Sequence, residues 1–135
     1  MNIQDLAIRL SDVKSVEGFS FDCQPIPGEV EVLQVTVSDY DELPSYVSIT
    51  DTQLLCITYL FTEDEVKPEM KAELMEEMLE LNIPIPLSAF AKIGDRYVIF
   101  GAMSVNSTID EITHELVTLS ENAVEAITAL EEFLN

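Results

Sequence analysis

The pattern of apolar and polar positions is clearest over residues 88–105, SAFAKIGDRYVIFGAMSV, where it predicts a β-hairpin. Gly94 and Asp95 suit a two-residue turn of type II′, because glycine readily takes the positive φ of the first position. This turn sets the cross-strand pairs Ile93–Arg96, Ala91–Val98, Phe90–Ile99 and Ala89–Phe100. Both faces of the second strand carry apolar side chains, so we expect neither face to be fully exposed to water.

Gly101 removes a side chain from the middle of the second hairpin strand. A glycine inside a strand often marks a bulge or a close approach of another group to the backbone. Two interpretations stay open, namely an ordinary core hairpin and a ligand that lies against Gly101.

Apolar alternation and β-branched residues predict further strands upstream, over residues 30–37, 46–50 and 53–61. An extra short strand over residues 18–23 is expected to end at the Pro-Ile-Pro-Gly run 25–28. Residues 53–61 are the most apolar segment and predict a central strand. Its two expected faces are Leu55, Ile57, Tyr59 and Phe61 on one side, and Leu54, Cys56 and Leu60 on the other.

Helical spacing of apolar residues predicts three helices. Asn2 caps the first, and Pro68 suits the first position of the second, over residues 68–81. The second helix carries an apolar stripe of four residues: Met70, Leu74, Met78 and Leu81. Met75 and Leu79 widen this stripe, which is typical of core or dimer packing and also of an adaptable partner-binding surface.

The last helix is predicted over residues 108–134, where Thr108 and Glu111 form a capping box. Its length would be about 40 Å at the standard helical rise. Because that length exceeds what a sheet of this size can cover, we expect a bend near Asn122 or an extension toward a partner.

The predicted order is α-βββ-α-ββ-α, with the extra strand near residues 18–23 as an addition. We therefore predict an α+β fold, in which helices lie mainly on one side of an antiparallel sheet. The length of 135 residues predicts a single domain, 1–135.

The charge excludes several classes of partner. Six Lys and Arg residues stand against 26 Asp and Glu residues, which gives a net charge of −20. Such a surface repels nucleic acids and anionic lipids and favours basic protein partners or simple solubility. The 47% hydrophobic content argues against disorder.

The sequence also predicts where the protein resides. No apolar run reaches the roughly 18 residues of a membrane span, and residues 1–10, MNIQDLAIRL, do not resemble a secretory signal. Cys23 and Cys56 are far apart and show no zinc spacing, so we predict reduced thiols in a cytoplasmic protein.

Candidate chemistry is sparse. His114 is the one histidine and is expected at the edge of a solvated helix face. Asp39, Asp41 and Glu42 are close in sequence but lack the pattern of a calcium loop. No nucleophile or phosphate-binding motif is present, so we predict no catalytic residue, no cofactor and no metal site.

Three runs, NIPIPLSAFAKIGDRYVIFGAMSV, LPSYVSITDTQLLCITYLFTEDEV and LSENAVEAITALEEFL, resemble the YjfI-like family of small acidic bacterial proteins. The resemblance covers most of the chain and brings no catalytic residues. Through the gene setting of some members, it implies a partner similar to the coiled-coil phage-shock protein A and a membrane-stress context. The order of elements is also similar to type III secretion chaperones and YbjN-like proteins, which implies dimerisation and binding of extended cargo segments.

These observations predict a non-enzymatic protein-binding module, chaperone-like or regulatory, with a basic or coiled-coil protein partner and no membrane insertion. The predicted partner-binding residues are the stripe Met70, Leu74, Met78 and Leu81, and a homodimer is expected. Two alternatives stay open: an enzyme or metal-dependent binder of small molecules that uses carboxylates, and an acidic mimic of nucleic acid.

Overall fold

The predicted hairpin forms strands β5 (Ala89–Ile93) and β6 (Arg96–Ser104) in the computed structural model, which describes residues 1–13 and 18–135. All four predicted cross-strand pairs are present. Gly94 has φ +60° and Asp95 has a negative φ, as a type II′ turn requires. The local turn chemistry therefore sets the register of this hairpin.

The sheet has six antiparallel strands in the order β1-β2-β3-β4-β6-β5, which confirms the α+β class. The four upstream strands are β1 (Phe21–Ile26), β2 (Val32–Val37), β3 (Ser45–Ile49) and β4 (Gln53–Thr62). β4 lies between β3 and β6, so the predicted central position is correct. The element order is α-ββββ-α-ββ-α, with the extra strand as a full member of the sheet.

Two details of the strand prediction are wrong. β1 continues through Pro25 to Ile26, because β1 is an edge strand and proline needs no hydrogen-bond partner on the free side. In β4 the pairing with β6 shifts by one residue between Tyr59 and Phe61. This bulge turns Phe61 to the same buried face as Cys56, whereas strict alternation placed it opposite.

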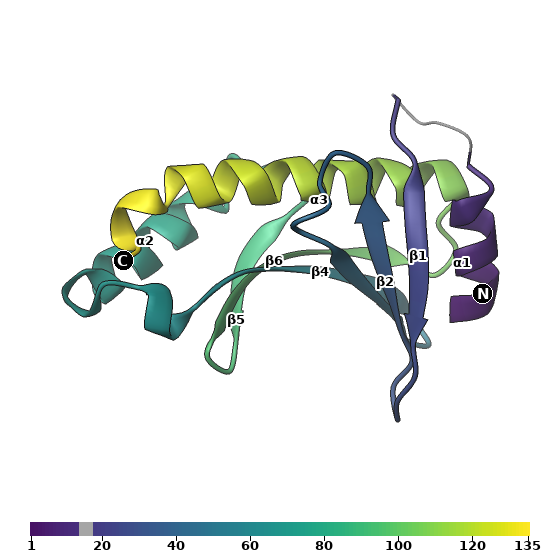
Figure 1. Cartoon of the computed structure of the whole chain (residues 1–135), viewed down its shortest axis with the longest axis horizontal. Coiled ribbons are helices and arrows are strands. Elements are labelled where there is room, and N and C mark those ends of the chain that lie inside the picture. The colour runs from purple at the N-terminus through teal and green to yellow at the C-terminus, as the bar shows by residue number, and fades with distance from the viewer. Residues whose placement is uncertain (14–17) are drawn as a thin grey trace.

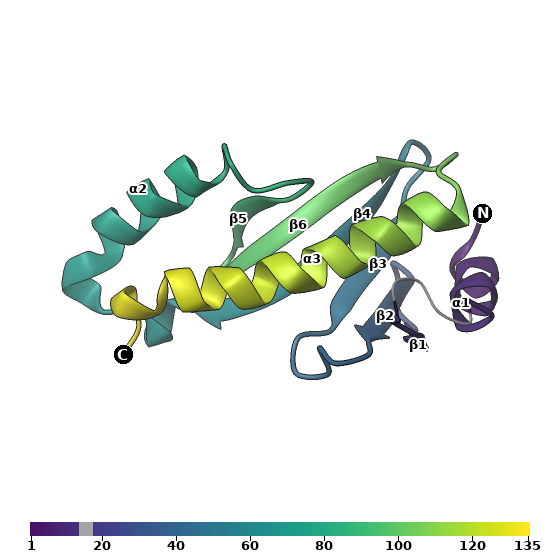
Figure 2. The same cartoon turned by 90° about the horizontal axis from the view of Figure 1, so that it is seen from above.

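All three helices pack on one face of the twisted sheet (Figure 1). They are α1 (Ile3–Ser11), α2 (Lys71–Leu81) and α3 (Ile109–Ala129). Seen from above, α3 crosses the sheet diagonally, with α1 near its start and α2 near its end (Figure 2). The core lies between this helical layer and the sheet, and every helix and strand contributes a buried apolar residue to it.

The predicted caps are present at α1 and α3. The Asn2 side chain accepts a hydrogen bond from the Asp5 backbone N–H at 2.8 Å. Thr108 and Glu111 form the predicted capping box at the start of α3. Pro68 opens a 3₁₀ turn (Pro68–Met70) that leads directly into α2.

The last helix is shorter than predicted. α3 ends at Ala129 and a 3₁₀ turn (Glu131–Phe133) follows, while the helix is continuous through Asn122. The Lys67 N–H donates to the Phe133 carbonyl at 2.8 Å, so the chain's own segment before α2 holds the end that was expected to need a partner.

Gly101 lies under a side chain of α3. A Cβ atom at this position would collide with Oε1 of Glu115 and would come within 3.0 Å of the Leu87 carbonyl oxygen. Of the two interpretations, the chain's own close approach therefore accounts for this glycine. Burial raises the pKa of the Glu115 carboxyl, which is 8% exposed.

Both cysteines are free thiols, but water reaches them differently. Cys23 is half-buried, and Cys56 is fully buried on β4. Burial, with a smaller effect of the nearby Glu115 charge, raises the pKa of Cys56 to about 12.

We predict that Cys23 reacts with Ellman's reagent in the folded protein, whereas Cys56 reacts only after denaturation, because the thiolate is the reactive form. Thiol titration at pH 8 with and without urea measures both reactions. Equal rates for the two thiols in the folded protein would contradict the burial of Cys56, and no free thiol after denaturation would contradict the reduced state.

Candidate functional site

The sequence predicted partner binding by four residues of one apolar stripe: Met70, Leu74, Met78 and Leu81. Met70 lies in the 3₁₀ turn before α2, and the other three lie in α2. Leu74 is fully buried and Met78 is 6% exposed, while the other two are half-buried against the same core. Packing within one chain therefore uses most of this stripe. The apolar side chains of α2 that water reaches are Met75 and Leu79, which are 37% and 69% exposed.

No helix in the described part of the chain lies over the sheet face opposite α1, α2 and α3 (Figure 1). We call this surface, formed by the strand side chains that point away from the helices, the open face. Strand register places nine large apolar residues on it: Ile26, Val32, Tyr46, Leu55, Ile57, Tyr59, Ile93, Val98 and Phe100. Ile26 and Ile93 are exposed, Val98 is buried, and the others are half-buried. An open face of an antiparallel sheet is usually polar, so this composition is a first sign of an interaction surface.

Charge is almost absent from the open face. Among the residues of the six strands that point to it, only Asp22 and Arg96 are charged. Acidic residues stand in the connections between the strands: Glu29, Glu31, Asp39, Asp41, Glu42, Asp51 and Asp95. Of these, Asp39, Asp41 and Glu42 share a hollow with Val124 of α3, and Glu29, Glu31 and Asp51 share a hollow with the residues at the start of α1. An apolar centre that is depleted of charge is the composition found in protein–protein interfaces.

The twisted sheet forms a hollow of about 380 Å³ on the open face. Tyr46 and Tyr59 meet edge to face in this hollow, with ring centroids 5.5 Å apart. The Arg96 guanidinium lies 4.9 Å from the centroid of the Tyr59 ring. Tyrosine and arginine are enriched among the residues that dominate binding energy at interfaces.

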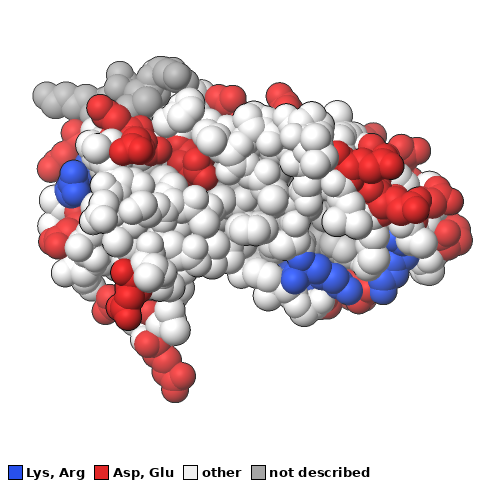
Figure 3. All heavy atoms as spheres, turned by 180° about the vertical axis from the view of Figure 1, so that it is seen from behind, with Lys and Arg blue, Asp and Glu red and all other residues white. Residues whose placement is uncertain are grey.

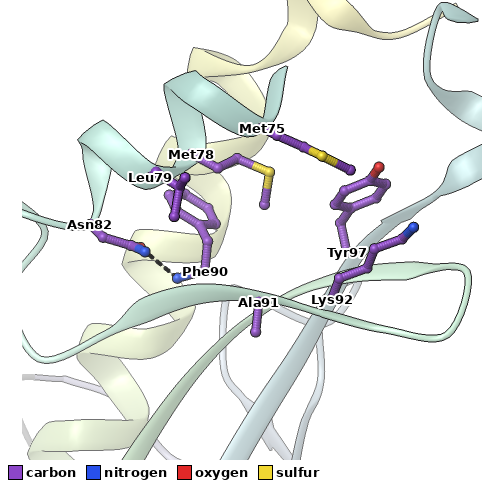
Figure 4. A pocket seen from close by; sticks show the side chains of 8 residues that line it. All are labelled: Met75, Met78, Leu79, Asn82, Phe90, Ala91, Lys92 and Tyr97. Atoms are coloured by element: carbon purple, nitrogen blue, oxygen red, sulfur yellow. Dashed lines mark hydrogen bonds between the residues drawn. The ribbon is translucent and has the colours of Figure 1, made fainter. Parts of the chain in front are cut away.

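A second cavity of about 230 Å³ lies on the other side of the sheet, between α2 and the β5–β6 hairpin (Figure 4). Eight residues line it: Met75, Met78, Leu79, Asn82, Phe90, Ala91, Lys92 and Tyr97. At one end, Oδ1 of Asn82 accepts a hydrogen bond from the Phe90 backbone N–H at 2.7 Å. At the other end, the Tyr97 hydroxyl is buried and has no hydrogen-bond partner among the described residues.

An ion cluster stands beside the Tyr97 end of this cavity. Glu63 accepts hydrogen bonds from Lys71 and from Lys92, the latter at 3.1 Å. The bond from Lys71, followed by that from Lys92, holds the pKa of Glu63 below its usual value. Basic side chains gather near the hairpin, next to the acidic surface at the α2 end of the molecule (Figure 3).

The structure gives little support to the other candidate chemistry. Asp39, Asp41 and Glu42 line a shared hollow, yet among residues 1–13 and 18–135 no group of three or more His, Cys, Asp or Glu side chains could hold a metal ion. His114 is exposed on α3, at the solvated position expected for it. Over the same residues, no helix is both long and apolar enough to cross a lipid bilayer.

The sequence identifies the residues of the open face but not the absence of a helix over it. The apolar residues on both faces of residues 53–61 predicted a central strand, and those of the second hairpin strand predicted that neither of its faces is fully exposed to water. Val98 is 1% exposed and Phe100 is half-buried, which agrees with this prediction. The structure shows helices on one side only, so the same pattern marks an uncovered apolar surface. Periodicity shows which residues share a face, but it does not show what covers that face.

The chain belongs to a family of bacterial proteins. The family model described as "Uncharacterized protein conserved in bacteria (DUF2170)" matches residues 1–134. A search of curated proteins finds no match. The family match confirms the prediction of an uncharacterised bacterial family, while the YjfI-like and chaperone-like resemblances stay predictions.

Proposed function

We propose that this member of the DUF2170 family is a non-enzymatic protein-binding module whose open face receives a partner protein. One observation carries the proposal: the open face is apolar and nearly free of charge in a chain with a net charge of −20. Large uncovered apolar surfaces are uncommon on monomeric proteins and usually mark interaction sites.

The net charge of −20 indicates the chemistry of the partner. A protein that docks on the open face brings its own rim toward a strongly acidic molecule. A rim rich in lysine or arginine would be attracted there, whereas an acidic rim would be repelled. The proposed partner therefore presents an apolar centre surrounded by basic residues.

This proposal includes the roles that the resemblances imply. A basic coiled-coil surface would satisfy the stated chemistry, and so would an extended cargo segment bound in a chaperone-like manner. The predicted homodimer would use the same face differently, because it would bring together two copies that each carry a net charge of −20.

A pair of matched variants tests the proposal. Ile57→Glu puts a negative charge into the hollow of the open face, and Leu79→Glu makes the same change of charge on an exposed residue of α2. With the tagged protein in an extract of the source bacterium, we expect the wild type and Leu79→Glu to capture a partner with a basic surface. We expect Ile57→Glu to lose that partner, and 0.5 M NaCl to weaken its binding.

Circular dichroism and thermal unfolding of each variant establish that it is folded. Loss of the partner with Leu79→Glu and retention with Ile57→Glu would contradict the assignment to the open face. Light scattering of the purified protein measures whether it is a homodimer. If it is, and if Ile57→Glu dissociates the dimer, the open face is used for self-association. A partner whose nucleic-acid site is blocked, and whose binding Ile57→Glu leaves unchanged, would favour the nucleic-acid mimic.

A further inference from the structure

The Tyr97 hydroxyl is an unusual group in the cavity between α2 and the hairpin. Tyr97 is 1% exposed, and its hydroxyl has no hydrogen-bond partner among the described residues. In Figure 4 the ring borders the cavity, with the hydroxyl toward α2 and Met75. A buried hydroxyl without a partner costs free energy, so an acceptor atom in the cavity would stabilise the protein.

The walls of the cavity indicate an apolar ligand body. Thioether and hydrocarbon groups of Met75, Met78, Leu79 and Phe90 surround it. Its volume of about 230 Å³ exceeds that of an engineered apolar cavity, about 150 Å³, that binds benzene. Methionine side chains adapt to ligands of different shape, so a short alkyl chain fits these walls.

The charges at the Tyr97 end indicate a negative head group. Among residues 1–13 and 18–135, Lys92 is the only charged residue that lines the cavity, and its ammonium lies 5.5 Å from the centroid of the Tyr97 ring. Lys71 and Lys92 share the single carboxylate of Glu63, which leaves a net positive charge on this group of three. This end of the cavity therefore attracts an anion, although the chain as a whole is strongly acidic.

We propose that this cavity binds a small amphiphilic carboxylate, whose head accepts a hydrogen bond from the Tyr97 hydroxyl beside Lys71 and Lys92. The alkyl tail lies along α2 among the methionine side chains. The site is on the helix-covered side of the sheet and is independent of the open face. An aliphatic acid and the carboxyl end of a peptide share this head group, and the apolar cavity walls favour the aliphatic acid.

Isothermal titration calorimetry with sodium octanoate tests the site. We expect saturable binding of octanoate, binding of octanol at least tenfold weaker because the charge is missing, and no binding of acetate because the tail is missing. N-acetyl-leucine carries the same head on a branched, peptide-like tail. Tighter binding of this compound than of octanoate would overturn the aliphatic assignment in favour of a peptide end.

Two tyrosine variants locate the head group. Tyr97→Phe keeps the ring and removes only the hydroxyl, so we expect octanoate binding to weaken about tenfold, as for the loss of one hydrogen bond to a charged group. Tyr46→Phe makes the same change on the open face and should leave binding unaltered. Equal affinity of the two variants, equal affinity of octanol and octanoate, or no saturable binding would each overturn the proposal.

The melting temperature of Tyr97→Phe without ligand is a further test of the proposal. If the Tyr97 hydroxyl lacks a partner in the free protein, Tyr97→Phe should leave the melting temperature unchanged or raise it. A clear fall in the melting temperature without ligand would show that the hydroxyl is already hydrogen-bonded, and this result would also overturn the proposal.

Discussion

Leu74→Ala is expected to lower the free energy of unfolding by about 3 kcal/mol, which is typical when a large buried side chain is truncated. Leu74 is fully buried on the side of α2 that faces the core. Leu79 lies on the same helix but is 69% exposed, so Leu79→Ala should change the free energy of unfolding by no more than about 0.5 kcal/mol. Urea denaturation followed by circular dichroism measures both changes.

The comparison of these two variants tests the docking of α2. Similar small losses for both would mean that α2 does not pack on the core in solution. Leu74→Glu should unfold the chain for the same reason, because it buries a charge without a partner. Loss of a dimer in that variant would therefore not identify an interface.

The homodimer stays a prediction, but its structural basis has changed. The apolar stripes of α2 and α3 are largely buried within one chain, and residues 65–67 hold the end of α3. The open face is an apolar surface that no helix among residues 1–13 and 18–135 covers. A mass near 15.1 kDa by light scattering would reject the dimer, and it would leave the open face for a different protein.

Elements controlled by local chemistry were predicted well. The register of β5 and β6 follows from a two-residue turn whose geometry glycine permits. The starts of α1 and α3 follow from the side chains of Asn2 and Thr108, which satisfy free backbone N–H groups. Each of these signals acts within a few residues, so no knowledge of the tertiary structure is needed to interpret it.

Two features that depend on the tertiary structure, the end of β1 and the side to which Phe61 points, were predicted wrongly. Pro25 is accepted inside β1 only because that strand lies at the edge of the sheet. Phe61 joins the core only because β4 gains one extra residue opposite β6. Strand order and bulges result from the whole set of pairings, which apolar alternation within one strand does not specify.

The candidate sites show the same difference between local signals, which the sequence contains, and features that the tertiary structure determines. The α2 stripe was identified correctly as one apolar face, but its burial within the chain depends on how α2 lies against β5 and β6. The Tyr97 cavity joins α2 to a strand more than ten residues away in sequence, and no motif links the two. The lack of a hydrogen-bond partner for the Tyr97 hydroxyl can be recognised only from the three-dimensional structure, which gives the positions of all neighbouring groups.

Gly101→Ala is expected to lower the free energy of unfolding by about 2 kcal/mol, because the added methyl group overpacks a closed site. The new Cβ would collide with Oε1 of Glu115 and would lie 3.0 Å from the Leu87 carbonyl oxygen. Gly28→Ala is the matched control, since its Cβ meets only the Val30 carbonyl oxygen at 3.5 Å and its φ is not positive. That control should be neutral or slightly stabilising, because alanine restricts the unfolded chain.

A double-mutant cycle identifies the group that lies against Gly101. Glu115→Ala removes the carboxylate that the new methyl group would meet, so Gly101→Ala should cost about 1 kcal/mol less in that background. An equal cost in both backgrounds would place the strain at the Leu87 backbone and not at the Glu115 side chain.

Gly101 lies on the side of β6 that faces α3, whereas its neighbours Phe100 and Ala102 point to the open face. Gly101→Ala should therefore reduce stability without changing the affinity for a partner bound to the open face. The variant thus tests whether opposite faces of β6 control stability and partner binding.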